Sequence, residues 1–94
     1  MKIIIDGLFI ASEDDFHKAI AKELNLPSWY GHNLNALWDV LTGMIERPLE
    51  LVWLNSEMSR TRLGRYEKII ELLEDISNRD VHLGRKMNFE YILK

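Results

Sequence analysis

The sequence contains no cysteine, which excludes disulfide bonds, thiolate nucleophiles and cysteine-bound metals. The absence of cysteine fits a reducing compartment. Long hydrophobic runs are also missing: none approaches the roughly 20 residues of a membrane-spanning helix, and the apolar run at the N-terminus is too short for a signal peptide. We therefore expect a soluble, cytoplasmic protein that does not act at a membrane.

Motifs typical of enzymes are absent as well. The sequence has no glycine-rich phosphate loop and no HExxH pair of zinc-binding histidines. Its three histidines, His17, His32 and His82, lack the spacing of metal ligands, and we expect them to be solvated or helix-capping residues. The sequence therefore predicts no metal or other cofactor, and it favours a protein that is not an enzyme.

Charged side chains are distributed unevenly along the chain. Residues 1–50 contain eight acidic and four basic side chains, a net charge of −4, whereas residues 51–94 contain seven acidic and eight basic ones, a net charge of +1. Binding that depends on nucleic-acid phosphates needs a basic face. The acidic first half therefore argues against nucleic acid and suits a basic protein partner, although charge that serves only solubility would look the same.

Hydrophobic spacing divides the chain into alternating strands and helices. Short runs rich in β-branched and aromatic residues predict strands, and apolar residues three and four positions apart predict helices. The segment 55–62 is open between a loop and a short helix, and 78–84 is expected to be a turn. The expected strands are 2–6, 49–54 and 87–93, and the expected helices are about 13–24, 34–42 and 63–78.

Capping residues mark the ends of the first two helices. Ser12 precedes three acidic residues that suit the positive end of a helix dipole, and Asn25 can take the left-handed conformation that closes a helix. Pro27 prevents the first helix from continuing. Asn33 is expected to cap the second helix, and Gly43 is expected to lie just beyond its end.

The resulting order, β-α-α-β-α-β, predicts the α/β class. Helices between successive strands act as crossovers, so the strands should form a small three-stranded parallel sheet with helices packed on it. The crossovers should be right-handed. Because no repeat or linker interrupts the 94 residues, we expect a single domain spanning residues 1–94.

Two side-chain stripes follow the helix after Asn33. An apolar stripe at helical spacing should face the core, and it comprises Leu34, Leu37, Val40, Leu41 and Met44. A second stripe lies about 100° around the helix and comprises Asn35, Trp38, Asp39 and Thr42. Spacing alone places Trp38 at the flank of the core. An exposed aspartate such as Asp39 is, taken by itself, most often only solvated.

Two aromatic rings, Trp29 and Tyr30, stand immediately before this helix. Their spacing leaves open whether they fold back onto the sheet or remain exposed. Rings around a single carboxylate, here Asp39, are typical of a protein-interface hot spot, where they exclude water and strengthen a central charged contact. The combination favours a protein-binding surface over a helix that only packs.

A long run of unusual residues at fixed spacing occupies the same window. It comprises Leu26-Pro27, Tyr30-Gly31, Asn33-Leu34, Ala36-Leu37-Trp38-Asp39 and Leu41-Thr42-Gly43, with weaker matches at Gly7, Ser12, Asp15, His17, Glu23-Leu24 and Pro48-Leu49. These residues resemble the barstar family of intracellular ribonuclease inhibitors. The resemblance covers the first half well and the last helix by pattern, and it implies the same three-stranded parallel sheet covered by helices.

The resemblance also implies an inhibitor or immunity protein that binds the active site of a secreted basic ribonuclease such as barnase, one to one. Asp39 would then enter the phosphate pocket of the nuclease, because a carboxylate can accept paired hydrogen bonds from arginine much as phosphate does. Asp75 would be a second acidic contact, with a merely solvated carboxylate as the equal alternative. The implied contact surface comprises Trp29, Gly31, Asn33, Asn35, Trp38, Asp39, Thr42, Gly43 and Asp75.

Several residues of this sequence depart from the family pattern. Asn35 and His32 stand in place of acids, Trp29 in place of a tyrosine and Met44 in place of a tryptophan, and the segment 55–65 is rich in arginine. Exchanging a contact charge for a neutral group is a direct way to change specificity. The expected partner is therefore a barnase-like ribonuclease or a related toxin. A general protein-interaction or regulatory module on the same fold is the alternative.

Overall fold

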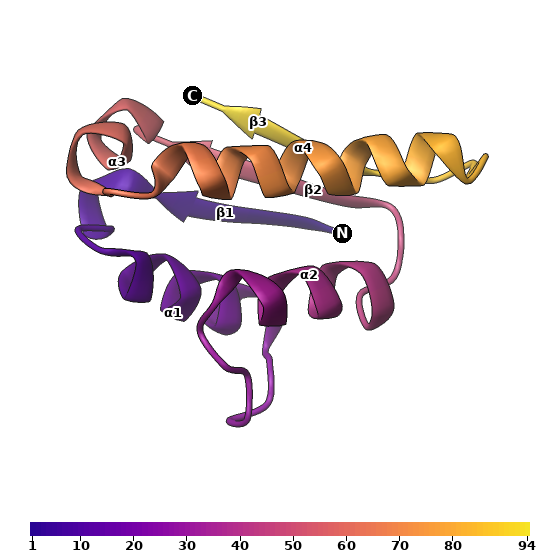
Figure 1. The fold of residues 1–94 in the computed structure, drawn as a ribbon, viewed down its shortest axis with the longest axis horizontal. Helices are drawn as coiled ribbons and strands as arrows, with labels where there is room; N and C mark the ends of the chain where they lie inside the picture. The colour runs from indigo at the N-terminus through magenta and orange to yellow at the C-terminus, as the bar shows by residue number, and fades with distance from the viewer.

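The computed structural model describes all 94 residues, and its element order confirms the α/β prediction (Figure 1). A short 3₁₀ turn at Gly7–Phe9 follows the first strand. The three strands are β1 (Lys2–Asp6), β2 (Leu49–Leu54) and β3 (Phe89–Leu93), and the four helices are α1 (Glu13–Leu24), α2 (Leu34–Gly43), α3 (Ser56–Arg62) and α4 (Tyr66–His82).

The strands form one parallel sheet in the order β1-β2-β3. Ile3 of β1 lies opposite Leu51 of β2, which lies opposite Tyr91 of β3. Side chains alternate across the sheet, because Ile3 and Ile5 are buried whereas Ile4 between them is 47% exposed. The helices therefore cover the face that carries Ile3 and Ile5, with α1 against β1 and α4 against β3 (Figure 1).

The core is centred on Trp53 of β2, which is completely buried. Its ring stacks on Phe16 of α1 with centroids 5.0 Å apart, and its indole N–H donates to Ser59 Oγ of α3 at 3.1 Å. A Cβ atom at Gly7 would lie 2.2 Å from the carbonyl oxygen of Asn55. The chain segments that leave β1 and β2 therefore approach each other too closely for any residue but glycine at position 7.

The last helix differs from its prediction at both ends. It spans Tyr66–His82 and not 63–78, so much of the turn expected at 78–84 is helical. Leu63, expected to begin this helix, is buried but lies in the connection before it. Residues 78–80 have the polar composition of a turn, yet Asp80 is completely buried and paired with Arg47. A tertiary contact thus extends the helix beyond the limit that local composition suggests.

Smaller differences concern the ends of other elements. Residues 56–62 form α3, which decides the choice between loop and helix. Strand β3 begins at Phe89, two residues later than predicted. Gly43 is the last residue of α2 and does not follow it, because the N–H of Met44 still donates to the Val40 carbonyl at 3.0 Å and continues the helical pattern.

Asp80 is a buried charge that joins three parts of the chain. Its Oδ2 atom lies 2.5 Å from Arg47 Nε and accepts the Phe89 N–H at 2.7 Å, while Arg85 Nε is 3.7 Å from Oδ1. Arg47 also donates to the Leu41 carbonyl at 2.7 Å. Burial by itself raises the pKa of Asp80, but the bonds from Arg47 and Phe89 outweigh it and hold the pKa below its ordinary value.

Replacement of Asp80 by alanine is expected to lower the free energy of unfolding by about 3–5 kcal/mol, because Arg47 would remain buried without a counter-charge. Asp80→Asn keeps an acceptor for the Phe89 N–H but loses the charge, and it should show a smaller loss. Urea denaturation at neutral pH measures both, with the exposed Glu90→Ala as control. A loss below about 1 kcal/mol for the alanine variant would contradict this role of Asp80.

Candidate partner-binding surface

Asn33 organises the start of α2. Its side-chain oxygen accepts the Ala36 N–H at 2.8 Å, which confirms the predicted helix cap. Its amide nitrogen donates to the Gly31 carbonyl at 2.9 Å. A Cβ at Gly31 would lie 3.1 Å from that nitrogen, so a larger residue would crowd the cap. The two hydrogen bonds join α2 to the preceding loop, and one amide N–H of Asn33 remains free.

Helix α2 has the buried and exposed faces that its spacing predicts. Its fully buried positions are Leu37, Val40 and Leu41. Asn35 and Asp39 are exposed on the opposite side. Trp38 is partly buried against the core and lies between the two faces, as expected. The outward stripe of α2 is therefore available to a partner.

At the end of α2, the prediction for one residue of the core stripe, Met44, is wrong. Met44 was expected in the core, but it is 49% exposed because the helix ends at Gly43 and the stripe is not continued. A Cβ at Gly43 would meet no atom within 4 Å. The Thr42 hydroxyl donates to the Trp38 carbonyl at 2.7 Å, so it is partly engaged within the helix. The exposed surface of α2 thus extends past Thr42 to Met44.

Asp39 and Asp75 are the two carboxylates expected to meet a partner. Both are exposed, and neither forms a hydrogen bond or ion pair within the chain. Asp39 lies in the middle of α2, and Asp75 lies on α4, which packs against α2. The fold therefore places the two free carboxylates on adjacent helices, although no contact joins them.

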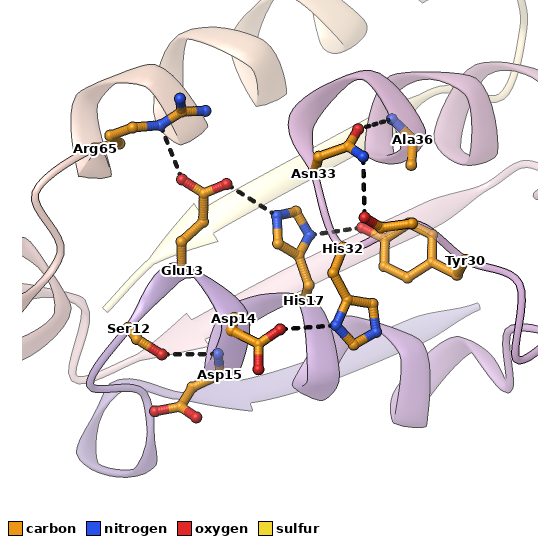
Figure 2. Close-up of polar contacts among 11 residues, drawn as sticks. Ser12, Glu13, Asp14, Asp15, His17, Tyr30, His32, Asn33, Ala36 and Arg65 are labelled. Atoms are coloured by element: carbon orange, nitrogen blue, oxygen red, sulfur yellow. Dashed lines mark hydrogen bonds and ion pairs between the residues drawn. The ribbon is translucent and has the colours of Figure 1, made fainter.

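The two rings before α2 have different environments. Trp29 is 67% exposed, whereas Tyr30 is only 4% exposed and its hydroxyl lies 2.7 Å from His17 Nδ1 (Figure 2). Burial raises the pKa of Tyr30 far above its ordinary value, so the hydroxyl stays protonated and can donate to His17. Of the two rings, Trp29 alone is left on the surface, and Tyr30 anchors the loop.

The prediction for His17 is wrong. A solvated or capping residue was expected, but the His17 side chain is completely buried and both ring nitrogens have partners. Its Nε2 lies 3.2 Å from Glu13, which also binds Arg65 at 2.9 Å (Figure 2). Burial lowers the pKa of His17, and Glu13 offsets only part of this effect. The available signal in the sequence was the spacing of Glu13 and His17, four positions apart beside the apolar Phe16.

The neutral, buried His17 should make stability depend on pH. Because its pKa is lower in the folded state than the ordinary 6.5, the unfolded chain takes up the proton first as the pH falls. The contribution is fully present above about pH 6.5 and is lost as the pH decreases from there toward the folded-state pKa. Urea denaturation between about pH 8 and pH 5 measures the slope. His17→Gln should show a smaller slope, and an equal slope would assign the effect to other groups.

The surface around Asp39 is open and not a cleft. The two hollows of the molecule lie elsewhere, one beside Met1 and Pro48 and the other between α3, α4 and Lys94. No group of three or more metal-ligating side chains comes together. None of the helices has the length and apolar character needed to cross a membrane. Such an open face suits contact with another protein better than enclosure of a small ligand.

Comparison with known proteins places the chain in a family. The family model described as "Barstar (barnase inhibitor)" matches residues 1–92. This chain belongs to the barstar family. A Bacillus subtilis (strain 168) relative, named "Putative ribonuclease inhibitor YrdF", is 43% identical over 75 residues, which cover 79% of this chain and 82% of that protein. Membership of the barstar family confirms the predicted resemblance and supports a role like that of the barnase inhibitor.

Gly43 offers a test of whether the end of α2 belongs to the binding surface of this barstar-family protein. Alanine adds a methyl group that meets no atom within 4 Å, and it removes a glycine from a helix, so stability should rise by up to about 1 kcal/mol. Binding to a ribonuclease should weaken if a partner packs there. Thermal unfolding and titration calorimetry measure the two effects. Unchanged binding would show that Gly43 is not part of the partner-binding surface.

Proposed function

We propose that this protein binds and blocks the active site of a secreted basic ribonuclease, one to one, with Asp39 in the place of an RNA phosphate. Family membership supports a ribonuclease as the partner. The observation that carries the proposal is the state of Asp39, an exposed carboxylate in the middle of α2 without any partner in the chain. Its oxygens are free to accept paired hydrogen bonds from an arginine in a phosphate pocket.

Other carboxylates near the start of α1 are engaged, unlike Asp39. Glu13 and Asp14 bind imidazole and basic groups, and Asp15 accepts the Ala11 N–H at 3.0 Å. A carboxylate that has to leave such partners before it meets a new one contributes less net free energy to binding. Asp39 gives up only contacts with water, so it can contribute the full attraction of a carboxylate to a cationic pocket.

Exposed apolar groups of the loop and of α2 suit the rim of a hot spot. Trp29 is 67% exposed and Met44 is 49% exposed, and Trp38 lies at the border of the helix. Apolar contacts of this kind exclude water from a central charged contact and strengthen it. The buried bond between Tyr30 and His17 holds the loop in one conformation before binding, which reduces the entropy lost in the complex.

The proposed contact surface extends over the loop before α2, the outward stripe of α2 and one position of α4. Asn35 places a neutral amide on the stripe, four residues before Asp39. Asp75 supplies the second unpaired charge. The complete set is Trp29, Gly31, Asn33, Asn35, Trp38, Asp39, Thr42, Gly43 and Asp75.

A second candidate is a module that binds a toxin other than a ribonuclease, or another protein. The observation that favours it is the small number of free charges, since Asn35 is neutral and Asp14 is engaged by His32 and Lys18. Such a surface suits a partner with a single cationic pocket. Co-purification from the producing cells with mass spectrometry separates the candidates, because recovery of a non-nuclease, with no nuclease neutralised, would favour the second.

Asp39→Ala is expected to weaken the complex by about two orders of magnitude or more, roughly 3 kcal/mol, while the free energy of unfolding stays nearly unchanged. Calorimetric titration and inhibition of ribonuclease activity measure the effect, first with barnase and then with any nuclease recovered by co-purification. The matched control is Glu90→Ala, an exposed carboxylate on β3, which should bind as the unmodified protein does. Equal affinity of the Asp39 variant for the true partner would sink the proposal.

A further inference from the structure

His32 occupies an unusual backbone position in the loop before α2. Its φ angle is +47°, in the left-handed region that favours glycine and, among other residues, asparagine, aspartate and histidine. A side chain held in this region costs some free energy unless its contacts offset the strain. Here the offsetting contact is a hydrogen bond of 2.8 Å between His32 Nδ1 and Asp14 Oδ1 of α1 (Figure 2).

Two aromatic rings and one carboxylate lie against the His32 ring. Its centroid lies 6.1 Å from that of His17, with the two planes 24° apart, and 5.4 Å from that of Tyr30. The Nδ1 atom is bound to Asp14, and 35% of the side chain remains exposed. The one polar ring atom of His32 without a partner in the chain is therefore Nε2.

Asp14 decides which ring nitrogen of His32 carries the proton. Its bond to His32, and then its bond to Lys18 at 3.0 Å, hold the pKa of Asp14 below its ordinary value, so the carboxylate can only accept hydrogen bonds. Nδ1 of His32 is then the donor. In the neutral ring Nε2 carries a lone pair and accepts a hydrogen bond.

The other titratable groups near this ring are already committed. His17 and Tyr30 bind each other behind it, and Glu13 lies on the far side of His17 with Arg65. None of them contacts Nε2 of His32. Nε2 of His32 is therefore a free hydrogen-bond acceptor. It lies in a loop that the bonds of Tyr30 and His32 hold against α1.

We propose that His32 is a further contact and a specificity determinant of the inhibitory surface, accepting through Nε2 a hydrogen bond from a donor group on the ribonuclease, and that Asp14 is its positioning residue. The inference rests on the proposed function, since His32 lies between Gly31 and Asn33 of the proposed surface. A partner group that only accepts hydrogen bonds gains no bond from the neutral ring at this position, because Nε2 is itself an acceptor.

The free protein provides the first test, by ¹⁵N NMR of the imidazole nitrogens at neutral pH. We expect His32 to carry its proton on Nδ1, and Asp14→Ala to shift the ring toward the Nε2–H tautomer. His17 serves as the internal reference, since its partners do not change. A His32 ring that carries its proton on Nε2 in the unmodified protein would overturn the inference.

Two matched variants test the contact in the complex. His32→Asn suits the left-handed backbone and places a donor near Nδ1 that can keep the bond to Asp14, but it has no group at the position of Nε2. His32→Gln places an amide near the position of Nε2 and gives up the Asp14 bond. We expect His32→Asn to lower the affinity about 3- to 10-fold at neutral pH with its thermal stability retained, and His32→Gln to lower it less.

The order of the two variants separates contact from simple structural support. If His32 only supported the loop, His32→Gln, which gives up the Asp14 bond, would lose more affinity and thermal stability than His32→Asn. The ribonuclease used is one whose binding is lost in Asp39→Ala. A complex whose affinity responds to Asp39→Ala but not to His32→Asn sinks this inference alone, whereas no response to Asp39→Ala sinks the proposed function.

Discussion

The loop before α2 carries Trp29, Gly31 and Asn33 of the proposed surface. Its position depends on one buried hydrogen bond, between Tyr30 and His17. Both groups are almost completely inaccessible to water, so breaking the bond would leave polar atoms unsatisfied in the core. The bond fixes Tyr30 against α1 and so determines where the neighbouring side chains lie. Trp29 points outward, and His32 reaches Asp14 at the first turn of α1. The loop is therefore held against α1 at two points, Tyr30 and His32.

The opposite end of α2 is held by a second buried contact. Arg47 binds the Leu41 carbonyl and Asp80, and Asp80 also accepts the Phe89 N–H of β3. With Asn33 capping its first turn, α2 is held at both ends, and its rotation about its own axis is set by the buried Leu37 and Leu41. The outward direction of Asp39 is a consequence of these constraints. The surface proposed to meet a partner is thus pre-organised by the buried residues behind it and by the Asn33 cap at its edge.

Local patterns predicted most of the fold because they report local physics. The strand at 2–6, the first helix from Ser12 to Asn25 and the stripe on α2 all depend on capping and periodicity within one element. The errors share a different cause. Asp80 lengthens α4 through an ion pair with a residue 33 positions away, and His17 is buried because a loop tyrosine folds back onto it. The spacing of residues within a single element carries no information about such contacts between elements.

The amino-acid sequence by itself determined the α/β class, the outward stripe with its single carboxylate, and the residues that carry the resemblance to the barstar family. The class follows from patterns within each element, and the stripe and most of the resemblance lie in residues 26–43, so none of them needs knowledge of distant contacts. Only the tertiary structure decided which of the two rings is exposed, that Met44 leaves the core, and that Asp39 is unpaired while Asp14 is engaged. Exposure and pairing depend on packing between elements, and packing is a property of the assembled chain.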